Sequence, residues 1–311
     1  MQGGIDRQDL RVEIPPEKFH LIEVITQENV VYEGIKFPQI RNTVDSLNYA
    51  QHEFQVRDED VFNVTYPKSG TTWMQEILTL INSKGDLSQH KLIPSWERVP
   101  WVEQTTGRGF LENRPSPRLI TSHLQAHLFP KSFFKTKAKV IYTMRNPKDV
   151  CVSLYNYCQI TKFLECIENF AEFHSVFIKG DVIYGSWFDH VSGWLKMKDQ
   201  ATILLMSYEG MLQDPRGSVL KICKFLGRDL DDAAIDSVVE NTSFIKLKNN
   251  QMSNYSLLSD EYMHHKKGSF FRKGISGDWK NYFTVAQSEQ LDHLFQEKMK
   301  DFNLKEKFMW D

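Results

Sequence analysis

The stretch that decides the fold is Val61-Phe62-Asn63-Val64-Thr65-Tyr66-Pro67-Lys68-Ser69-Gly70-Thr71-Thr72-Trp73. Residues 61–66 are rich in β-branched and aromatic side chains, which favours a strand, and Pro67 ends that strand in a turn. Residues 71–83 then place apolar side chains at helical spacing. A strand that runs through a short polar loop into a helix is the building unit of an α/β protein.

The same alternation continues along the chain. Further strands are predicted at 118–121, 138–144 and 202–207, and further helices at 147–157, 217–226 and 286–301. This order predicts an α/β fold, a single domain with a central parallel β-sheet flanked by helices. Residues 245–285 have little periodicity, which predicts a long loop lying over a functional region. We expect an N-terminal extension at 1–30 and one domain at 31–311.

The composition excludes several classes of protein. Of 311 residues, 41% are hydrophobic and 25% charged, and the formal net charge is −2, so disorder and coiled coil are excluded. A generally basic nucleic-acid binder is disfavoured, although a local basic pocket remains open. No apolar run approaches the ~18 residues of a membrane helix. The polar N-terminus and the four cysteines without a CxxC pair predict a cytoplasmic protein with reduced thiols.

The loop after the first strand has the chemistry of a phosphate site. Free backbone N–H groups and the positive end of the helix dipole favour an anion there. Gly70 allows close approach of the backbone, and Lys68 adds a positive charge. The lysine precedes the glycine, so the loop differs from the GxxxxGK[ST] motif. An ordinary Ser/Thr-rich cap on a core helix is the alternative.

Four blocks in order carry a resemblance to a known family. They are 66–73 (YPKSGTTW), 145–149 (RNPKD), 185–190 (GSWFDH) and 272–280 (RKGISGDWK). Together they resemble the cytosolic sulfotransferases, and the resemblance runs from about residue 32 to 310. Three stretches are most similar to the hydroxysteroid branch, namely 94–103 (PSWERVPWVE), 186–195 (SWFDHVSGWL) and 252–258 (MSNYSLL).

The resemblance implies a P-loop nucleotide-kinase-like fold and a reaction. The family transfers a sulfuryl group from 3′-phosphoadenosine 5′-phosphosulfate to a hydroxyl or an amine, and no metal is implied. The 5′-phosphosulfate loop maps to Lys68, Ser69, Gly70, Thr71, Thr72 and Trp73, with the Trp73 ring near the adenine. The 3′-phosphate site maps to Arg145, Ser153, Arg272, Lys273 and Gly274, and further nucleotide contacts map to Tyr208, Thr242 and Phe244. A surface ion pair for Arg145 and a core position for Phe244 are the alternatives.

The resemblance assigns the general base to His123, in the Ser-His-Leu pattern that follows a predicted strand. The ordinary pKa of a histidine lies close to the working pH, which suits proton removal from a hydroxyl. The sequence departs from the family just afterwards, because Gln125 replaces the usual proline, and His127 is therefore a rival base. Thr121 stands where phenol-type members often carry a lysine, which the hydroxysteroid branch commonly lacks.

The implied mechanism is an in-line attack of the acceptor oxygen on sulfur while His123 takes the proton. Lys68 and the loop N–H groups offset the charge that develops on the leaving phosphate. Trp96, Trp101 and Tyr255 match positions that line the acceptor pocket, and core aromatics are the alternative. The expected acceptor is a small apolar alcohol, steroid or sterol-like. Phenols, bile-type alcohols and amines remain open.

Two functions of other classes compete with this interpretation. An ATP-dependent P-loop phosphotransferase would need a GK[ST] motif and a magnesium-binding carboxylate, and neither is evident in the sequence. A non-catalytic protein that binds a nucleotide or a lipid would not need His123. No cluster has metal-ligand spacing. Residues 280–289 resemble the family's dimer motif and predict a weak homodimer, with a plain helix start capped by Thr284 as the alternative.

Overall fold

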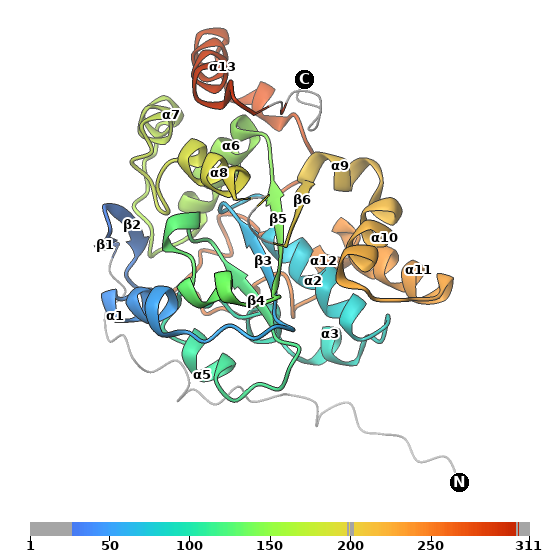
Figure 1. Cartoon of the computed structure of the whole chain (residues 1–311). Coiled ribbons are helices and arrows are strands. Elements are labelled where there is room, and N and C mark those ends of the chain that lie inside the picture. Colours follow the sequence, from blue (N-terminus) through green and yellow to red (C-terminus); the bar gives the residue numbers. More distant parts are fainter. Residues whose placement is uncertain (1–26, 198, 200–201, 303, 305–311) are drawn as a thin grey trace.

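The computed structural model describes residues 27–197, 199, 202–302 and 304. The expected N-terminal extension at 1–30 therefore lies almost wholly outside the described residues. The described chain is built around one sheet with helices on both of its faces (Figure 1). The expected α/β fold with a central parallel sheet is confirmed.

The sheet has four parallel strands in the order β4-β3-β5-β6. They are β3 (Val61–Thr65), β4 (Leu119–Ser122), β5 (Lys139–Met144) and β6 (Ile203–Ser207). The register pairs Val61 with Leu119 on one side and with Lys139 on the other, while Val140 of β5 pairs with Ile203. Since all four strands run the same way, their carboxyl ends meet at one edge of the sheet.

Neighbouring residues of each central strand face two different cores. Phe62 of β3 and Tyr142 of β5 belong to one core, whereas Val61 and Ile141 belong to the other. The first core is covered by α6 (Pro147–Ile160), α7 (Phe170–Lys179), α8 (Trp187–Lys196) and α13 (Val285–Met299). The second is covered by α2 (Thr71–Asn82), α9 (Tyr208–Gln213), α10 (Pro215–Leu226) and α11 (Asp232–Asn241). This two-sided burial explains why the strands are apolar throughout.

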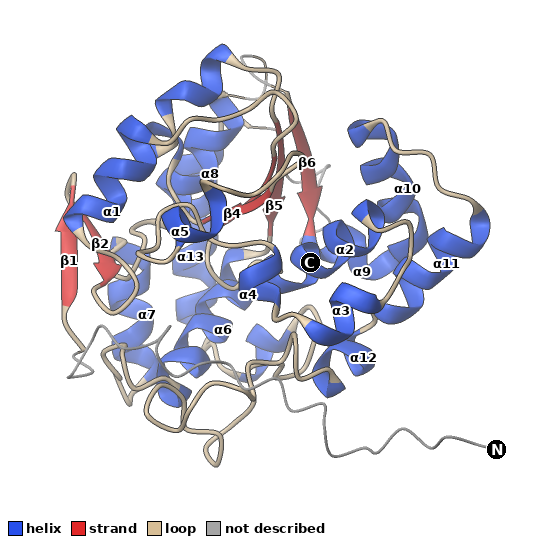
Figure 2. Cartoon of the chain, turned by 90° about the horizontal axis from the view of Figure 1, so that it is seen from below, coloured by secondary structure: helices blue, strands red, loops and turns tan. Residues whose placement is uncertain are grey.

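Shorter elements surround this framework (Figure 2). They are the antiparallel hairpin β1 (Asn29–Tyr32) and β2 (Ile35–Pro38), α1 (Val44–Asn48), a π-helix (Tyr49–Glu53), α3 (Ser88–Leu92), α4 (Ser95–Arg98), α5 (Gly107–Leu111) and α12 (Phe244–Asn249). Three 3₁₀ turns lie at Ala126–Leu128, Lys131–Lys135 and Asp278–Asn281. The predicted strands and helices are confirmed with ends that differ by one to three residues.

The prediction of an uninterrupted loop at 245–285 is wrong at both ends. Helix α12 covers its beginning, and a 3₁₀ turn at Asp278–Asn281 interrupts it further on. Only Leu247 of α12 is buried, so this helix has no apolar face that periodicity could reveal. Residues 250–277, between the two, carry no helix or strand.

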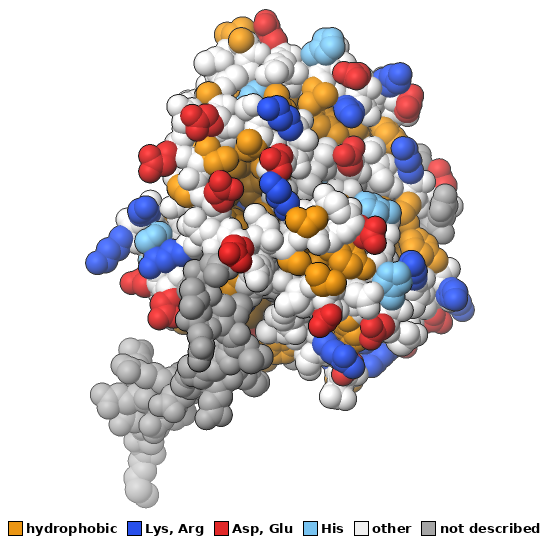
Figure 3. All heavy atoms as spheres, turned by 90° about the vertical axis from the view of Figure 1, so that its left-hand side faces the viewer, with side chains coloured by type: hydrophobic (Ala, Val, Ile, Leu, Met, Phe, Trp, Pro, Cys, Tyr) orange, Lys and Arg blue, Asp and Glu red, His pale blue; other side chains and the backbone are white. Residues whose placement is uncertain are grey.

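The surface agrees with the near-balanced charge of the chain. Acidic and basic side chains are interspersed with apolar ones over the face that Figure 3 presents. All four cysteines are free, and three of them are buried while Cys166 is exposed. Within the part of the chain that the structure describes, no helix is both long and apolar enough to cross a membrane.

Candidate active site

A cavity of about 260 Å³ lies at the carboxyl ends of the four strands. Each strand end contributes to its lining: Pro67 follows β3 closely, while His123, Arg145 and Tyr208 directly follow β4, β5 and β6. Ligands in open α/β sheets bind at this edge. All the residues predicted for the donor, the acceptor and the base line this one cavity except Ser69, which is buried beneath the loop.

The phosphate loop turns sharply between β3 and α2. Lys68 has φ 70° and Gly70, the N-cap of α2, has φ 100°. A left-handed φ suits glycine but strains a lysine, and such strain is concentrated at ligand-binding sites. The hydroxyl of Thr71 lies 2.7 Å from that of Thr65, which fixes the first turn of α2 to the end of β3. The free N–H groups of this turn therefore face the cavity from a rigid base.

The ammonium group of Lys68 lies between two aromatic rings. Its Nζ is 4.0 Å from the ring centroid of Tyr157 and 4.3 Å from that of Phe270. Loss of solvent, with the nearby charges of Arg145 and Arg272, lowers the pKa of Lys68 to about 7. No carboxylate of the described residues forms an ion pair with it. A bound anion would therefore offset the mutual repulsion of these cations and favour the charged form of Lys68.

Three of the predicted 3′-phosphate residues, Arg145, Arg272 and Lys273, are cations that line the same cavity. Arg145 donates to the carbonyl oxygens of Lys68 and Ile275 at 3.0 and 3.1 Å, and its Nε finds no partner among the described residues. Arg272 pairs with Asp278, and Lys273 reaches the same carboxylate at 2.6 Å. Burial opposes ionisation of Asp278, but these hydrogen bonds outweigh it and lower its pKa to about 2. The carboxylate therefore holds both cations in place at the cavity edge.

The predicted adenine-side residues form an aromatic wall. The rings of Trp73 and Tyr208 meet edge to face, with centroids 5.6 Å apart, and the guanidinium of Arg145 lies 4.2 Å from the Tyr208 centroid. Phe244 packs on the backbone of Gly274, where an added Cβ would lie 2.1 Å from its ring. Gly274 also has φ 68°, so only glycine fits this contact. Phe244 also lines the cavity, so it is not a core residue alone.

His123 is held by the backbone of the neighbouring strand. Its Nδ1 lies 2.8 Å from the carbonyl oxygen of Thr65, so Nδ1 carries the hydrogen and Nε2 is left as the acceptor. The sequence suggested an ordinary pKa near the working pH, but burial, together with the charge of Lys68, lowers the pKa of His123 to about 4. The imidazole is therefore neutral at physiological pH, which is the form that can accept a proton.

Gln125, which replaces the family's usual proline after His123, keeps a backbone conformation that a proline could also adopt. Gln125 has φ −62°, a value that proline also adopts, and its side chain donates to the carbonyl oxygen of Tyr184 at 3.2 Å. His127 is exposed and does not line the cavity. The rival base thus lies apart from the groups that the cavity brings together.

Comparison with known proteins identifies the family. A family model described as the sulfotransferase domain matches residues 58–303. The chain belongs to the sulfotransferase family. It is 50% identical over 280 residues to human Sulfotransferase 2A1, which covers 90% of this chain and 98% of that relative. It is 46% identical over 280 residues to the 3-beta-hydroxysteroid sulfotransferase of Cavia porcellus, covering 90% and 97%.

Solved structures agree with this membership. A crystal structure of mouse sulfotransferase SULT7A1 complexed with PAP superimposes with a TM-score of 0.74 and 32% sequence identity, covering 89% of this chain and 97% of that one. The described residues of this sulfotransferase contain no group of three or more histidine, cysteine, aspartate or glutamate side chains that could hold a metal ion.

The predicted acceptor residues of the sulfotransferase lie together on the other side of His123. The Trp96 and Tyr255 rings are 5.0 Å apart, and the Trp101 ring is 5.9 Å from the imidazole. Thr121 instead donates to the carbonyl oxygen of Val99 at 2.7 Å and accepts from Gln75 at 2.9 Å, outside the cavity lining. An aromatic chamber therefore adjoins the cationic donor side.

Sequence reasoning missed several residues around His123, the predicted base, and around Lys68 of this sulfotransferase. Glu103 is fully buried, and its Oε1 accepts the backbone N–H of His123 at 2.8 Å. Burial raises the pKa of Glu103 to about 7. Tyr184 packs edge-on against the imidazole at 5.2 Å. Glu103 is the last residue of the hydroxysteroid-like stretch 94–103, so the resemblance could have indicated it as a site residue. Nothing in the sequence indicates that Tyr157 and Phe270 lie beside Lys68.

Proposed function

We propose that this sulfotransferase moves the sulfuryl group of 3′-phosphoadenosine 5′-phosphosulfate to the hydroxyl of a steroid or sterol-like alcohol. One observation carries the proposal: a single cavity joins a cluster of cations, a neutral imidazole and an aromatic chamber. The names of the human and Cavia porcellus relatives support the reaction and the acceptor class.

The donor side fits an adenosine bisphosphate derivative. Among the residues that line the cavity, Trp73 Nε1 and Arg145 Nε are buried polar atoms without partners in the described part of the chain. Unpaired buried donors cost free energy, so they favour a ligand that supplies oxygen acceptors. We assign the 5′-phosphosulfate to the loop at 68–73 and the 3′-phosphate to Arg145, Ser153, Arg272, Lys273 and Gly274. The bound mouse relative is described as a complex with PAP, which supports this assignment.

In the mechanism we propose, the acceptor oxygen forms a bond to sulfur as the bond from sulfur to the bridging phosphate oxygen breaks. Nε2 of His123 takes the acceptor proton, because Nδ1 is already committed to the carbonyl oxygen of Thr65. Negative charge gathers on the departing phosphate, where Lys68 and the N–H groups of α2 stabilise it. The low pKa of His123 keeps it neutral before the reaction and releases the proton readily afterwards.

The remaining assignments concern the organisation of the protein. We propose that residues 31–311 form the sulfotransferase unit, that 1–30 are an extension, and that the protein works in the cytoplasm like the family it resembles. A homodimer through 280–289 is supported by the exposed side chain of Val285, 75% of whose surface is accessible. The same segment also starts α13, since Thr284 caps the backbone N–H of Gln287. Sedimentation at several concentrations tests the dimer, and a monomer throughout contradicts it.

A transfer assay tests the function directly. The protein is incubated with donor labelled in the sulfuryl group and a panel of steroid alcohols, phenols, bile-type alcohols and amines, with and without magnesium. We expect labelled steroid sulfate in both conditions. Label on phenols or amines alone would reject the acceptor class, and tight binding of 3′,5′-adenosine bisphosphate without any transfer would indicate the non-catalytic alternative. In parallel reactions with ATP labelled in its γ-phosphate in place of that donor, magnesium-dependent transfer of the label would indicate a phosphotransferase.

A further inference from the structure

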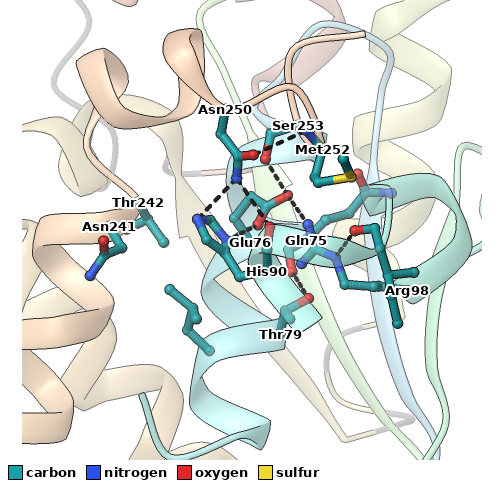
Figure 4. Close-up of polar contacts among 12 residues, drawn as sticks. Gln75, Glu76, Thr79, His90, Arg98, Asn241, Thr242, Asn250, Met252 and Ser253 are labelled. Carbon is teal, nitrogen blue, oxygen red and sulfur yellow. Dashed lines mark hydrogen bonds and ion pairs between the residues drawn. The ribbon is translucent and has the colours of Figure 1, made fainter. Parts of the chain in front are cut away.

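A buried polar cluster, shown in Figure 4, consists of residues that do not line the cavity. We call it the Glu76 cluster; its members are Glu76 of α2, His90 of α3, Arg98 of α4, and Asn250 and Ser253 of the segment after α12. Glu76 and Ser253 are fully buried, and His90 and Arg98 are 4% and 6% exposed. Burying such groups costs free energy unless they are well paired, and among the buried side-chain polar atoms of the cluster only Nη1 of Arg98 lacks a partner in the described residues, so the geometry is closely specified.

Glu76 is the hub of the cluster. Its carboxylate accepts from Nδ1 of His90 at 2.6 Å, from Arg98 at 2.6 Å and from the hydroxyl of Ser253 at 2.8 Å. Burial alone would raise the pKa of Glu76, but the hydrogen bond from His90 and the charge of Arg98 outweigh it and lower the pKa below its usual value. The carboxylate is therefore ionised and holds three elements of the chain at once.

His90 links this carboxylate to the C-terminal segment. Because its Nδ1 donates to Glu76, its Nε2 is free to accept from Nδ2 of Asn250 at 3.0 Å. The orientation of the Asn250 amide follows from its other contacts: Nδ2 also donates to the carbonyl oxygen of His90 at 3.2 Å, and Oδ1 accepts from the backbone of Met252 at 3.0 Å. His90 thus bridges Glu76 and Asn250 with one defined orientation of its ring.

The segment held in this way carries a strained acceptor residue. The carbonyl oxygen of Met252 accepts from the backbone of Ser95 at 2.7 Å, and two residues after Ser253 the chain reaches Tyr255. Tyr255 has φ 61°, a conformation that costs a non-glycine residue free energy and persists only where neighbours enforce it. Its ring lies 5.0 Å from that of Trp96 and 4.2 Å from that of Phe270. The cluster is therefore the anchor from which this side of the chamber projects.

We infer that His90, acting through Glu76 and Asn250, is a positioning residue for the acceptor. It holds 250–255 so that Tyr255 forms the chamber wall against Trp96, while the loop at 68–73 and Arg145, which follow the ends of β3 and β5, are left unaffected. This inference rests on the proposed function for the identity of the ligand.

Three variants test the inference. His90→Leu removes both hydrogen bonds at similar volume, His90→Gln keeps an amide donor and a carbonyl acceptor, and His174→Leu is the control, because His174 is equally buried but packs between Phe170 and Phe283. We expect His90→Leu to raise the acceptor KM about 3- to 10-fold, the weight of one or two hydrogen bonds. The Kd of 3′,5′-adenosine bisphosphate should stay unchanged, and His90→Gln should restore the acceptor KM to within about twofold.

Hydrogen exchange completes the test. In the unliganded protein, His90→Leu should speed amide exchange in 250–255, a readout that needs no turnover and so stands even if the proposed reaction fails. An unchanged acceptor KM and exchange rate in His90→Leu, equal weakening of the donor, an equal effect of His174→Leu, or no rescue by His90→Gln would each overturn the inference.

Discussion

The carbonyl oxygen of Thr65 accepts a hydrogen bond from Nδ1 of His123 at 2.8 Å, and this bond joins the proposed base to the strand that leads into the phosphate loop. The hydroxyl of the same threonine lies 2.7 Å from that of Thr71, at the start of α2. One residue therefore contacts both the base and the first turn of the donor helix. The position of the proposed base relative to the phosphate loop is therefore set by the end of a sheet strand.

Replacing the base is the most direct test of the mechanism. We expect His123→Ala to remain folded, to bind 3′,5′-adenosine bisphosphate normally, and to lose transfer by ~10²- to 10⁴-fold, the usual contribution of a general base. His127→Ala is the control, because this side chain is exposed outside the cavity, and it should retain wild-type turnover. A reversed result would move the base to His127, and near-normal turnover of both variants would reject general-base catalysis.

Two donor-site substitutions should differ in kind. Lys68→Ala should lower kcat far more than it weakens donor binding, because the charge that Lys68 offsets develops mainly in the transition state. Arg145→Ala should chiefly raise the donor Kd, since we assign it to the phosphate remote from the reacting bond. Steady-state kinetics and calorimetric titration with the bisphosphate separate the two effects. The donor assignment fails if both variants retain wild-type kcat and Kd.

The dependence of kcat/KM for the donor on pH follows from two shifted pKa values. His123 acts as a base in its neutral form, and with a pKa of about 4 it stays neutral as the pH falls to about 5, so no acid limb is expected there. Lys68, with a pKa of about 7, loses its positive charge as the pH rises, so donor capture by the free enzyme should decline above about pH 7.

Lys68→Arg provides the matched control for that profile, because an arginine stays charged across the range. Its kcat/KM should be lower overall but should not decline between pH 7 and 9. If kcat/KM of the wild type and of Lys68→Arg declined over the same alkaline pH range, the titrating group would be one other than Lys68.

Glu103 should influence stability through its raised pKa. A carboxyl group with a folded pKa of about 7 favours the folded state below its unfolded pKa and loses this advantage as the pH rises through about 7. Between about pH 4 and 7 the loss should be on the order of 3 kcal/mol in the free energy of unfolding. Glu103→Gln, which still accepts from the backbone of His123, should flatten this dependence in urea titrations. An identical slope in both proteins would contradict the burial argument.

The nucleotide should order the segment at 250–277. This segment has no helix or strand of its own, and it carries both Tyr255 and the cationic residues at 272–273. Its backbone gains partners when the cavity is filled, so 3′,5′-adenosine bisphosphate should slow amide exchange there. Equal exchange with and without the ligand would count against this expectation.

The sequence predicted those features that depend on local pattern. The parallel sheet followed from apolar strands alternating with helices, and the donor loop from Lys68 and Gly70 at a strand-to-helix turn. Helix α12 was not predicted, because only Leu247 among its side chains is buried and its sequence therefore shows no apolar periodicity. The aromatic contacts of Lys68 were not predicted either, because Tyr157 and Phe270 lie more than a hundred residues apart in the sequence. The low pKa of His123 depends on burial and on Lys68, which only the assembled cavity reveals.

The contact between Trp96 and Tyr255 has a consequence for how such an enzyme changes its substrate. The loop at 68–73 and Arg145 follow strand ends, where any shift would disturb the sheet, whereas this aromatic pair joins the short helix α4 to the segment after α12. Exchanges within the pair can therefore reshape the chamber for a different alcohol while nucleotide recognition is retained. The architecture lets the range of acceptors diversify on an unchanged reaction.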